Sequence, residues 1–347
     1  MEARGPSFIG VLRKLSFVLG VILVLLVPVA VWSPSAAAAA VPGVSMGLVA
    51  TLSFDRYLPV LWSLLSLCAV IWVALLVNSS VIASVLLMAL LGLATAMSGR
   101  VGMRSVAMQG AIFGAAALFP QPPPAGDIGS VLGATSTVAA VLVGGLVLAL
   151  VFHVITRGGT PAKPVITPWP STIANSVVLV LTLVIATYWV MSWDRTPVGA
   201  WLMVTIVVLA QPSTNITLWR SAERVVGTLL GAVLAAGIAV VMSATWQALV
   251  VGFIFVALAW SFRISHPVVE TGHYYWIYAF LWTPAMVLLT VPQGGSETLS
   301  ADGQRLVLTF LAAVSVAVVS ILTRWGVALV TPPSANSSQP QKASTDQ

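Results

Sequence analysis

The chain has very little charge. Asp, Glu, Lys and Arg together make up 7% of its 347 residues, whereas apolar residues make up 59%. Soluble domains typically contain about 25% charged residues, so the composition excludes an ordinary soluble protein. The net charge of +6 does not indicate nucleic-acid binding, because the basic residues stand singly between apolar runs.

Cysteine and catalytic signatures are also scarce. Cys68 is the only cysteine and lies inside an apolar run, which excludes a disulfide framework and a Cys-based metal site. The three histidines lack metal-ligand spacing, and neither a His-Glu-x-x-His motif nor a phosphate-binding loop is present. The Gly-x-Ser-x-Gly sequence at 43–47 lies in an apolar run instead of a strand-turn-helix. We therefore expect no enzyme, no metal, no cofactor and no ATP-driven step within this chain.

What the sequence does have is long apolar runs. A membrane-spanning helix needs about 20 mostly apolar residues, and about twelve candidate spans can be counted, which predicts an all-α, polytopic membrane protein. They lie at about 15–32, 36–53, 58–77, 80–98, 105–120, 129–155, 172–191, 197–213, 225–243, 246–262, 274–291 and 306–325.

The first run has a second interpretation. Basic residues precede it and Ala36–Ala40 follow it, as in a cleaved secretory signal. Cleavage near Ala40 would leave 41–53, which is too short to cross a bilayer. We therefore favour a first span that is retained.

The distribution of Lys and Arg predicts the orientation. With the N-terminus inside, thirteen of the fifteen basic residues fall on the inner side, and only Arg195 and Arg305 fall outside. Cytoplasmic loops carry such an excess of positive charge. The pattern predicts twelve spans in the plasma (inner) membrane, with both termini in the cytoplasm.

The spans divide into two sets of six. We expect a first membrane half at 1–155, a Gly- and Pro-containing cytoplasmic linker at 156–171, a second membrane half at 172–330 and a disordered cytoplasmic tail at 331–347. Asp55-Arg56 opens the third span of the first half, and Glu223-Arg224 opens the third span of the second. Parallel repeats of this kind are a known transporter architecture. The alternative is that any six-span unit places charges in its loops.

One stretch carries a recognisable motif. In residues 197–231, an apolar run with Trp201 ends in a Gln211-Pro-Ser break, and a basic segment leads to a Gly-Thr-x-x-Gly helix face. From about 197 to 325 the sequence resembles the fusaric-acid-resistance-like, or aromatic acid exporter, family of bacterial membrane transporters. Arg224, Gly227, Thr228 and Gly231 stand at the matching positions.

The resemblance implies a secondary transporter that exports small organic anions, aromatic carboxylates above all. The proton gradient would then be the energy source, because no nucleotide site is visible. A passive organic-anion channel and a non-transporting scaffold or accessory subunit for envelope assembly stay open as alternatives. Many relatives carry a large cytoplasmic domain, whereas the linker and tail here are short. Besides the bilayer and the substrate, the expected partners are therefore a second copy or a separate cytoplasmic or envelope protein.

The second span of each half is irregular. Pro42-Gly43 interrupts the first, and in the other the apolar run Val198–Ala210 meets Gln211-Pro212. A proline frees a helix carbonyl one turn back, and short or broken spans at corresponding positions indicate a transporter's binding site. The alternative is that Pro and Gly serve helix packing.

Several residues are candidates for the pathway. Arg220 and Arg224 could both be solvated anchors at the inner face. Arg224 is the better candidate for the site, because it abuts an apolar run and can hold a carboxylate through two parallel hydrogen bonds. Titratable groups that could carry a proton are Glu223, Glu270 and His273. The substrate-lining set is Trp201, Thr205, Gln211, Arg224, Tyr274 and Trp276, although the aromatic residues could instead form an interfacial belt. Gly227 and Gly231 have the spacing of a helix-packing motif.

Overall fold

A computed structural model describes residues 20, 34–54, 56–119, 131–155, 166–193, 199–210, 214–242, 245–265, 274–290 and 296–330. The regular structure within these ranges is helical, which confirms the predicted all-α class. The elements are α2 (Pro34–Ser53), α3 (Tyr57–Val77), α4 (Val81–Ser98), the short 3-10 helix η1 (Gly99–Val101), α5 (Arg104–Ala117), α6 (Val131–Ile155), α7 (Trp169–Trp193), α8 (Ala200–Leu209), α9 (Thr214–Val241), α10 (Thr245–Ser265), α11 (Tyr275–Thr290) and α12 (Ser296–Val330).

Five helical segments in the described part of the chain are long and apolar enough to cross a membrane. They are Tyr57–Val77, Val81–Val101, Trp169–Trp193, Ile216–Ile238 and Val307–Trp325. The composition and these helices agree on a multi-pass membrane protein. The predicted span at 15–32, apart from Gly20, and the tail at 331–347 lie outside the described residues. The twelve-span topology and the two-repeat arrangement therefore stay predictions.

Three helices begin earlier than the hydropathy pattern predicts. α9 begins at Thr214 instead of near 225, and α12 begins at Ser296 instead of near 306. The reason in α9 is that its first turns are polar but still bury one face, so a search for apolar runs misses them. Helix α7 likewise begins at Trp169, inside the stretch assigned to the linker.

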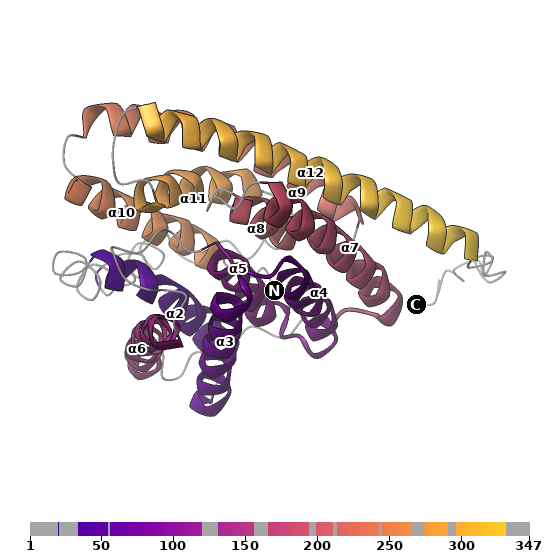
Figure 1. Ribbon diagram of the computed structural model, residues 1–347, viewed down its shortest axis with the longest axis horizontal. Helices are drawn as coiled ribbons and strands as arrows, with labels where there is room; N and C mark the ends of the chain where they lie inside the picture. Colours follow the sequence, from indigo (N-terminus) through magenta and orange to yellow (C-terminus); the bar gives the residue numbers. More distant parts are fainter. Residues whose placement is uncertain are drawn as a thin grey trace, which may run out of the picture.

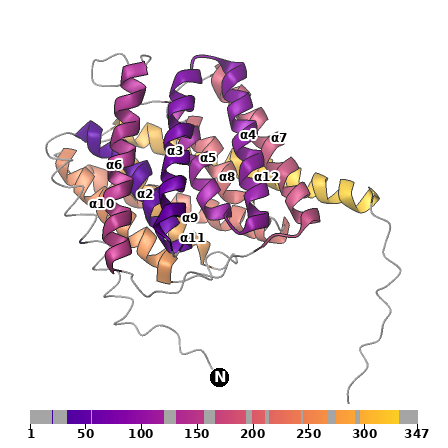
Figure 2. The same cartoon turned by 90° about the horizontal axis from the view of Figure 1, so that it is seen from below.

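The buried apolar residues form two clusters. One joins α2, α3 and α6, with contributions from α5 and α10, and the other joins α4, α5, α7, α8, α11 and α12. The second cluster crosses the predicted boundary between the halves, because α4 packs on α7 and α5 packs on α8. Helix α12 runs along one side of the molecule, and its C-terminal turns extend past the other helices (Figures 1 and 2).

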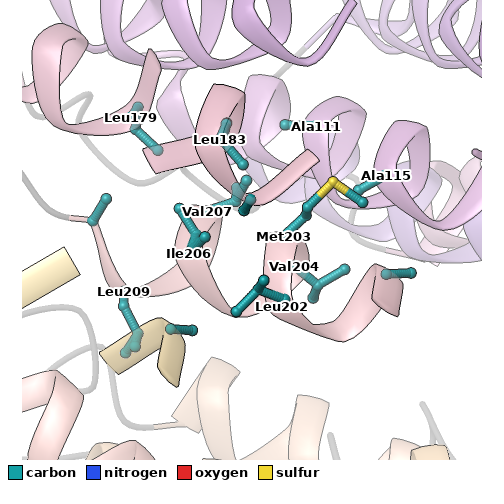
Figure 3. Close-up of a cluster of buried hydrophobic side chains, with 14 of the residues drawn as sticks. Ala111, Ala115, Leu179, Leu183, Leu202, Met203, Val204, Ile206, Val207 and Leu209 are labelled. Carbon is teal, nitrogen blue, oxygen red and sulfur yellow. The ribbon is translucent and has the colours of Figure 1, made fainter. Parts of the chain in front are cut away.

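Helix α8 lies in the interior. Its ten residues AWLMVTIVVL span about 15 Å, half of the roughly 30 Å hydrocarbon core of a bilayer. Leu179 and Leu183 of α7 lie on one side of it and Ala111 of α5 on another, close to Met203 and Val207 (Figure 3). A helix that is apolar on every side belongs in a protein core or against lipid, and most residues of α8 are buried within the protein.

Two pairs of helices approach closely because glycines line their contacts. In α9, a Cβ at Gly227 would collide with the carbonyl oxygen of Trp276 in α11, and one at Gly231 would lie 2.8 Å from the carbonyl oxygen of Phe280. In α2, a Cβ at Gly47 would lie 2.7 Å from the carbonyl oxygen of Gly145 in α6. Backbone cannot move aside as a flexible side chain can, so these contacts require glycine.

The Gly-x-Ser-x-Gly sequence is accounted for by this packing. It lies in α2, a helix that contains Pro42, and not on a strand-to-helix turn. Ser45 Oγ donates a hydrogen bond of 3.2 Å to Gln109 Oε1 in α5, and both side chains are buried. The serine therefore ties α2 to α5.

Candidate functional site

A polar stripe runs along the buried face of α9. Its members recur every three or four residues, the spacing that places side chains on one helix face. They are Thr217, Arg220, Ser221, Arg224 and Thr228. Arg220 is 8% exposed and Arg224 is 4% exposed. Neither arginine is therefore a solvated anchor, the alternative that the sequence left open for both, because this face of α9 packs against the protein.

Tyr275 of α11 contacts both arginines. Arg224 Nη1 donates to the Tyr275 hydroxyl oxygen at 3.4 Å, and the guanidinium carbon of Arg220 lies 5.3 Å from the centre of the Tyr275 ring. The tyrosine is only 3% exposed. Its hydroxyl accepts from one cation while its ring face attracts the other, and these contacts offset part of the cost of burying two charges.

Glu223 joins the same two helices on a less buried side. Its Oε2 accepts a 3.1 Å hydrogen bond from the backbone N–H of Trp276, in the first turn of α11. The first N–H groups of a helix lack partners within the helix and favour a negative charge. Glu223 thus caps α11.

Arg104, at the start of α5, is a site residue that the sequence patterns did not single out. Its Nη2 donates to the carbonyl oxygen of Ala210, the C-cap residue of α8. A cation at this position complements the negative end of the helix dipole.

The signal that could have identified Arg104 is its position. It stands directly before the apolar run of its helix, as Arg224 does in α9. Sequence alone could not show that this arginine meets α8, because that contact joins residues more than a hundred positions apart. The Ala210 carbonyl can accept from Arg104 because α8 ends at Leu209 and Ala210 is its C-cap.

The other predicted site residues are spread over several environments. Thr205 is 1% exposed in α8, one turn after the partly buried Trp201. Tyr274 and Trp276 are 58% and 37% exposed, so the buried member of the aromatic patch is Tyr275 between them. Gln211, Glu270 and His273 lie outside the described residues.

Some buried polar atoms have no hydrogen-bond partner among the described residues. They are Arg224 Nε, Thr228 Oγ1, Thr205 Oγ1 and Ser261 Oγ. Buried polar groups normally have a partner. Arg224 Nε and Thr228 Oγ1 belong to the same stripe of α9, one turn apart, and both can donate a hydrogen bond to an anion. Within the described ranges, no group of three His, Cys, Asp or Glu side chains could hold a metal ion.

The fold and site define a multi-pass helical membrane protein with arginines buried at the contact between two of its helices. Residues 174–323 match the family described as fusaric acid resistance protein-like, which supports the resemblance seen in the motif at 197–231. This is a family of membrane transporters, and the matched region contains α8, α9 and α11 and so every contact of Tyr275 described above. No curated protein and no solved structure matches the chain.

Proposed function

We propose that this protein is a secondary transporter that exports small organic anions, with aromatic carboxylates as the leading class, across the inner membrane. The observation that carries the proposal is the burial of Arg220 and Arg224 against Tyr275. Charged side chains in membrane helices are costly and usually mark an ion or substrate pathway. A scaffold has no need for two of them on one buried face, which favours transport over the scaffold alternative.

The chemistry of the site fits a carboxylate. A guanidinium forms two parallel hydrogen bonds to a carboxylate group, and Arg224 Nε has no partner among the described residues. Thr228 adds a hydroxyl donor one turn further along α9. Tyr275, Tyr278 and Trp282 form a row of neighbouring rings along α11, with centroids 5.8 Å apart in each pair. Aromatic surface of this kind suits an aromatic substrate.

The helix packing supports two repeats that could move against each other. In the second half α9 packs on α11 and α12, and α8 packs on α12. In the first half α3 packs on α5 and α6, and α2 packs on α6. In chain order, α2, α3, α5 and α6 of the first half correspond to α8, α9, α11 and α12 of the second. Transporters built from such repeats bind substrate between them and expose it alternately to each side.

The proton gradient is the proposed energy source. Glu223, Glu270 and His273 are the candidate proton carriers, and Glu223 already contacts α11 beside the arginines. Protonation of Glu223 would weaken its hydrogen bond to Trp276, because a carboxylate is the stronger acceptor. That change would loosen the α9–α11 contact, which is how a proton would be coupled to movement.

The test is counterflow of radiolabelled benzoate into proteoliposomes preloaded with unlabelled benzoate. We expect wild-type uptake and a loss of about 100-fold in Arg224→Ala, since losing a hydrogen bond to a charged group costs about 1.5–3 kcal/mol and leaves its partners unpaired. Arg224→Lys should recover only part of the activity. Equal uptake by wild type and Arg224→Ala would remove this site from the mechanism.

A second measurement separates the transporter from its alternatives. An imposed proton gradient should drive benzoate accumulation in wild-type vesicles, and a protonophore should abolish it. Benzoate flux that never exceeds equilibrium and ignores the protonophore would favour the anion channel. No specific flux of any organic anion would favour the scaffold.

A further inference from the structure

Arg224 is held at one end of its guanidinium group and unused at the other. Its Nη1 donates to the Tyr275 hydroxyl oxygen at 3.4 Å, whereas its buried Nε has no hydrogen-bond partner among the described residues. A guanidinium can bind a carboxylate through Nε and one Nη atom, or through both Nη atoms. Because Nη1 already bonds Tyr275, the pair that stays available is Nε with Nη2.

A second unpartnered donor lies on the same face of α9. Thr228 stands one turn after Arg224 and is 3% exposed, and its Oγ1 has no partner among the described residues. Helical side chains lean toward the N-terminus of their helix, so the Thr228 side chain leans toward the turn that carries Arg224. Both unpartnered donors therefore belong to α9, while the bond that holds Arg224 comes from α11.

Tyr275 itself is fixed by contacts that do not involve Arg224. Glu223 Oε2 accepts a 3.1 Å hydrogen bond from the backbone N–H of Trp276, the next residue. The carbonyl oxygen of Trp276 also lies so close to Gly227 that a Cβ there would collide with it. The backbone that carries Tyr275 is therefore held against α9. Because the tyrosine is 3% exposed, its hydroxyl has a defined position before any ligand binds.

We propose that Tyr275 is a positioning residue, which holds Nη1 and so orients Arg224 to present its Nε–Nη2 edge to the substrate carboxylate. This inference rests on the proposed function, since it takes Arg224 as the group that binds the anion. The Tyr275 hydroxyl acts through Arg224 and not on the anion itself. The ring of Tyr275, which lies beneath Arg220, is a separate contact.

The orientation of Arg224 then decides which ligands bind best. A carboxylate accepts two parallel hydrogen bonds only from a correctly turned guanidinium, whereas the single oxygen of an amide needs only one N–H donor. Loss of the Tyr275 hydroxyl leaves the charge of Arg224 in place. It should therefore weaken benzoate binding more than benzamide binding, whereas a general loss of packing would weaken both.

The experiment is a double-mutant cycle on the half-saturating benzoate concentration for counterflow, measured with full-length protein in proteoliposomes. We expect Tyr275→Phe alone to raise this concentration about three- to tenfold, and the half-saturating benzamide concentration about twofold or less. In the Arg224→Gln background, Tyr275→Phe should change the benzoate value about twofold or less. The reason is that a Gln amide ends near the position of Nε and is too short to reach Tyr275.

Tyr278→Phe is the matched control. Tyr278 is 8% exposed and lies about one turn further along α11, with its ring centroid 5.8 Å from that of Tyr275. The hydroxyl that Arg224 bonds is that of Tyr275. The effect of Tyr278→Phe on the half-saturating benzoate concentration should therefore be the same in the wild-type and Arg224→Gln backgrounds.

The outcomes separate the two proposals. A Tyr275→Phe effect that keeps its full size in Arg224→Gln would overturn the positioning role and leave the proposed function standing. Equal coupling of Tyr278→Phe to Arg224 would overturn that role as well. If wild type shows no benzoate counterflow, both proposals fail. If Arg224→Gln shows no measurable counterflow, the comparison of benzoate with benzamide in Tyr275→Phe decides: a selective loss for benzoate supports the role, and equal losses overturn it.

Discussion

Two arginine–aromatic contacts in this protein use the same chemistry in different surroundings. Arg100 lies over Trp169, whose side chain is 51% exposed, whereas Arg220 lies over Tyr275, which is 3% exposed. The first contact joins the turn after α4 to the start of α7, and the second lies within the packing of α9 against α11.

Burial decides what each contact does. Near solvent, a cation over an aromatic ring contributes about 0.5–1 kcal/mol and serves to position the chain. In the interior, charged groups keep a large desolvation cost unless opposite charge or many hydrogen bonds surround them. The Arg100 contact therefore positions α7, whereas we expect a bound anion to contribute most at the buried contact with Tyr275. The following predictions test that difference, from the largest expected effect to the smallest.

The largest effect should come from separating α9 from α11. Gly227→Val places a branched side chain against the Trp276 carbonyl, which cannot move aside. We expect the free energy of unfolding to fall by about 1–3 kcal/mol and benzoate counterflow to be lost, because Arg224 no longer meets Tyr275. Thermal unfolding in detergent and counterflow would be measured for the same preparation.

Gly237→Val is the control for that substitution. Gly237 lies on the same helix, and a Cβ added at this position would have no neighbouring atom within 4 Å. It should unfold and transport as wild type does. Similar losses in both variants would mean that α9 tolerates no larger side chain at either position. The loss of transport in Gly227→Val could then not be attributed to the α9–α11 contact.

A smaller effect should follow from Tyr275→Phe. This change removes the hydroxyl that Arg224 contacts but keeps the ring beneath Arg220. Because that hydrogen bond is long, we expect counterflow to fall by only about three- to tenfold. Tyr275→Leu, which also removes the ring, should lose clearly more. If Phe and Leu behave identically, the ring contributes nothing to the site.

The smallest effect should come from Arg100→Ala. The contact with Trp169 and the hydrogen bond to Thr167 are partly exposed, so their loss should lower the free energy of unfolding by about 1 kcal/mol or less. Benzoate counterflow at matched protein levels should stay at the wild-type rate. A transport defect as large as that of Arg224→Ala would show that burial does not distinguish the two sites.

Much of the fold could be predicted from apolar runs. They gave an all-helical membrane protein and placed most helices to within a few residues, because bilayer thickness fixes the length of a span. They failed at the start of α9, where the buried face carries Thr217, Arg220 and Arg224 and no apolar run exists. A helix of this kind can be recognised only by the three-to-four-residue spacing of residues that would ordinarily be exposed.

The buried cluster around Tyr275 could be predicted in part, for a similar reason. Arg224 stood out because it abuts an apolar run and lies in the family motif. The choice among Tyr274, Tyr275 and Trp276 depends on the rotation of α11 about its axis, which packing against Gly227 and Gly231 sets. Arg104 could not be identified from the sequence, because its contact with Ala210 joins distant parts of the chain and no local pattern encodes such a contact.

The central claim is that the buried arginines of α9 recognise a negative charge. Counterflow of benzoate can be compared with that of benzamide, which has nearly the same shape and no charge, in wild type and in Arg224→Gln. The account predicts that wild type prefers benzoate by at least about tenfold and that Arg224→Gln loses this preference through a fall in benzoate flux alone. An unchanged preference for benzoate in Arg224→Gln would contradict it.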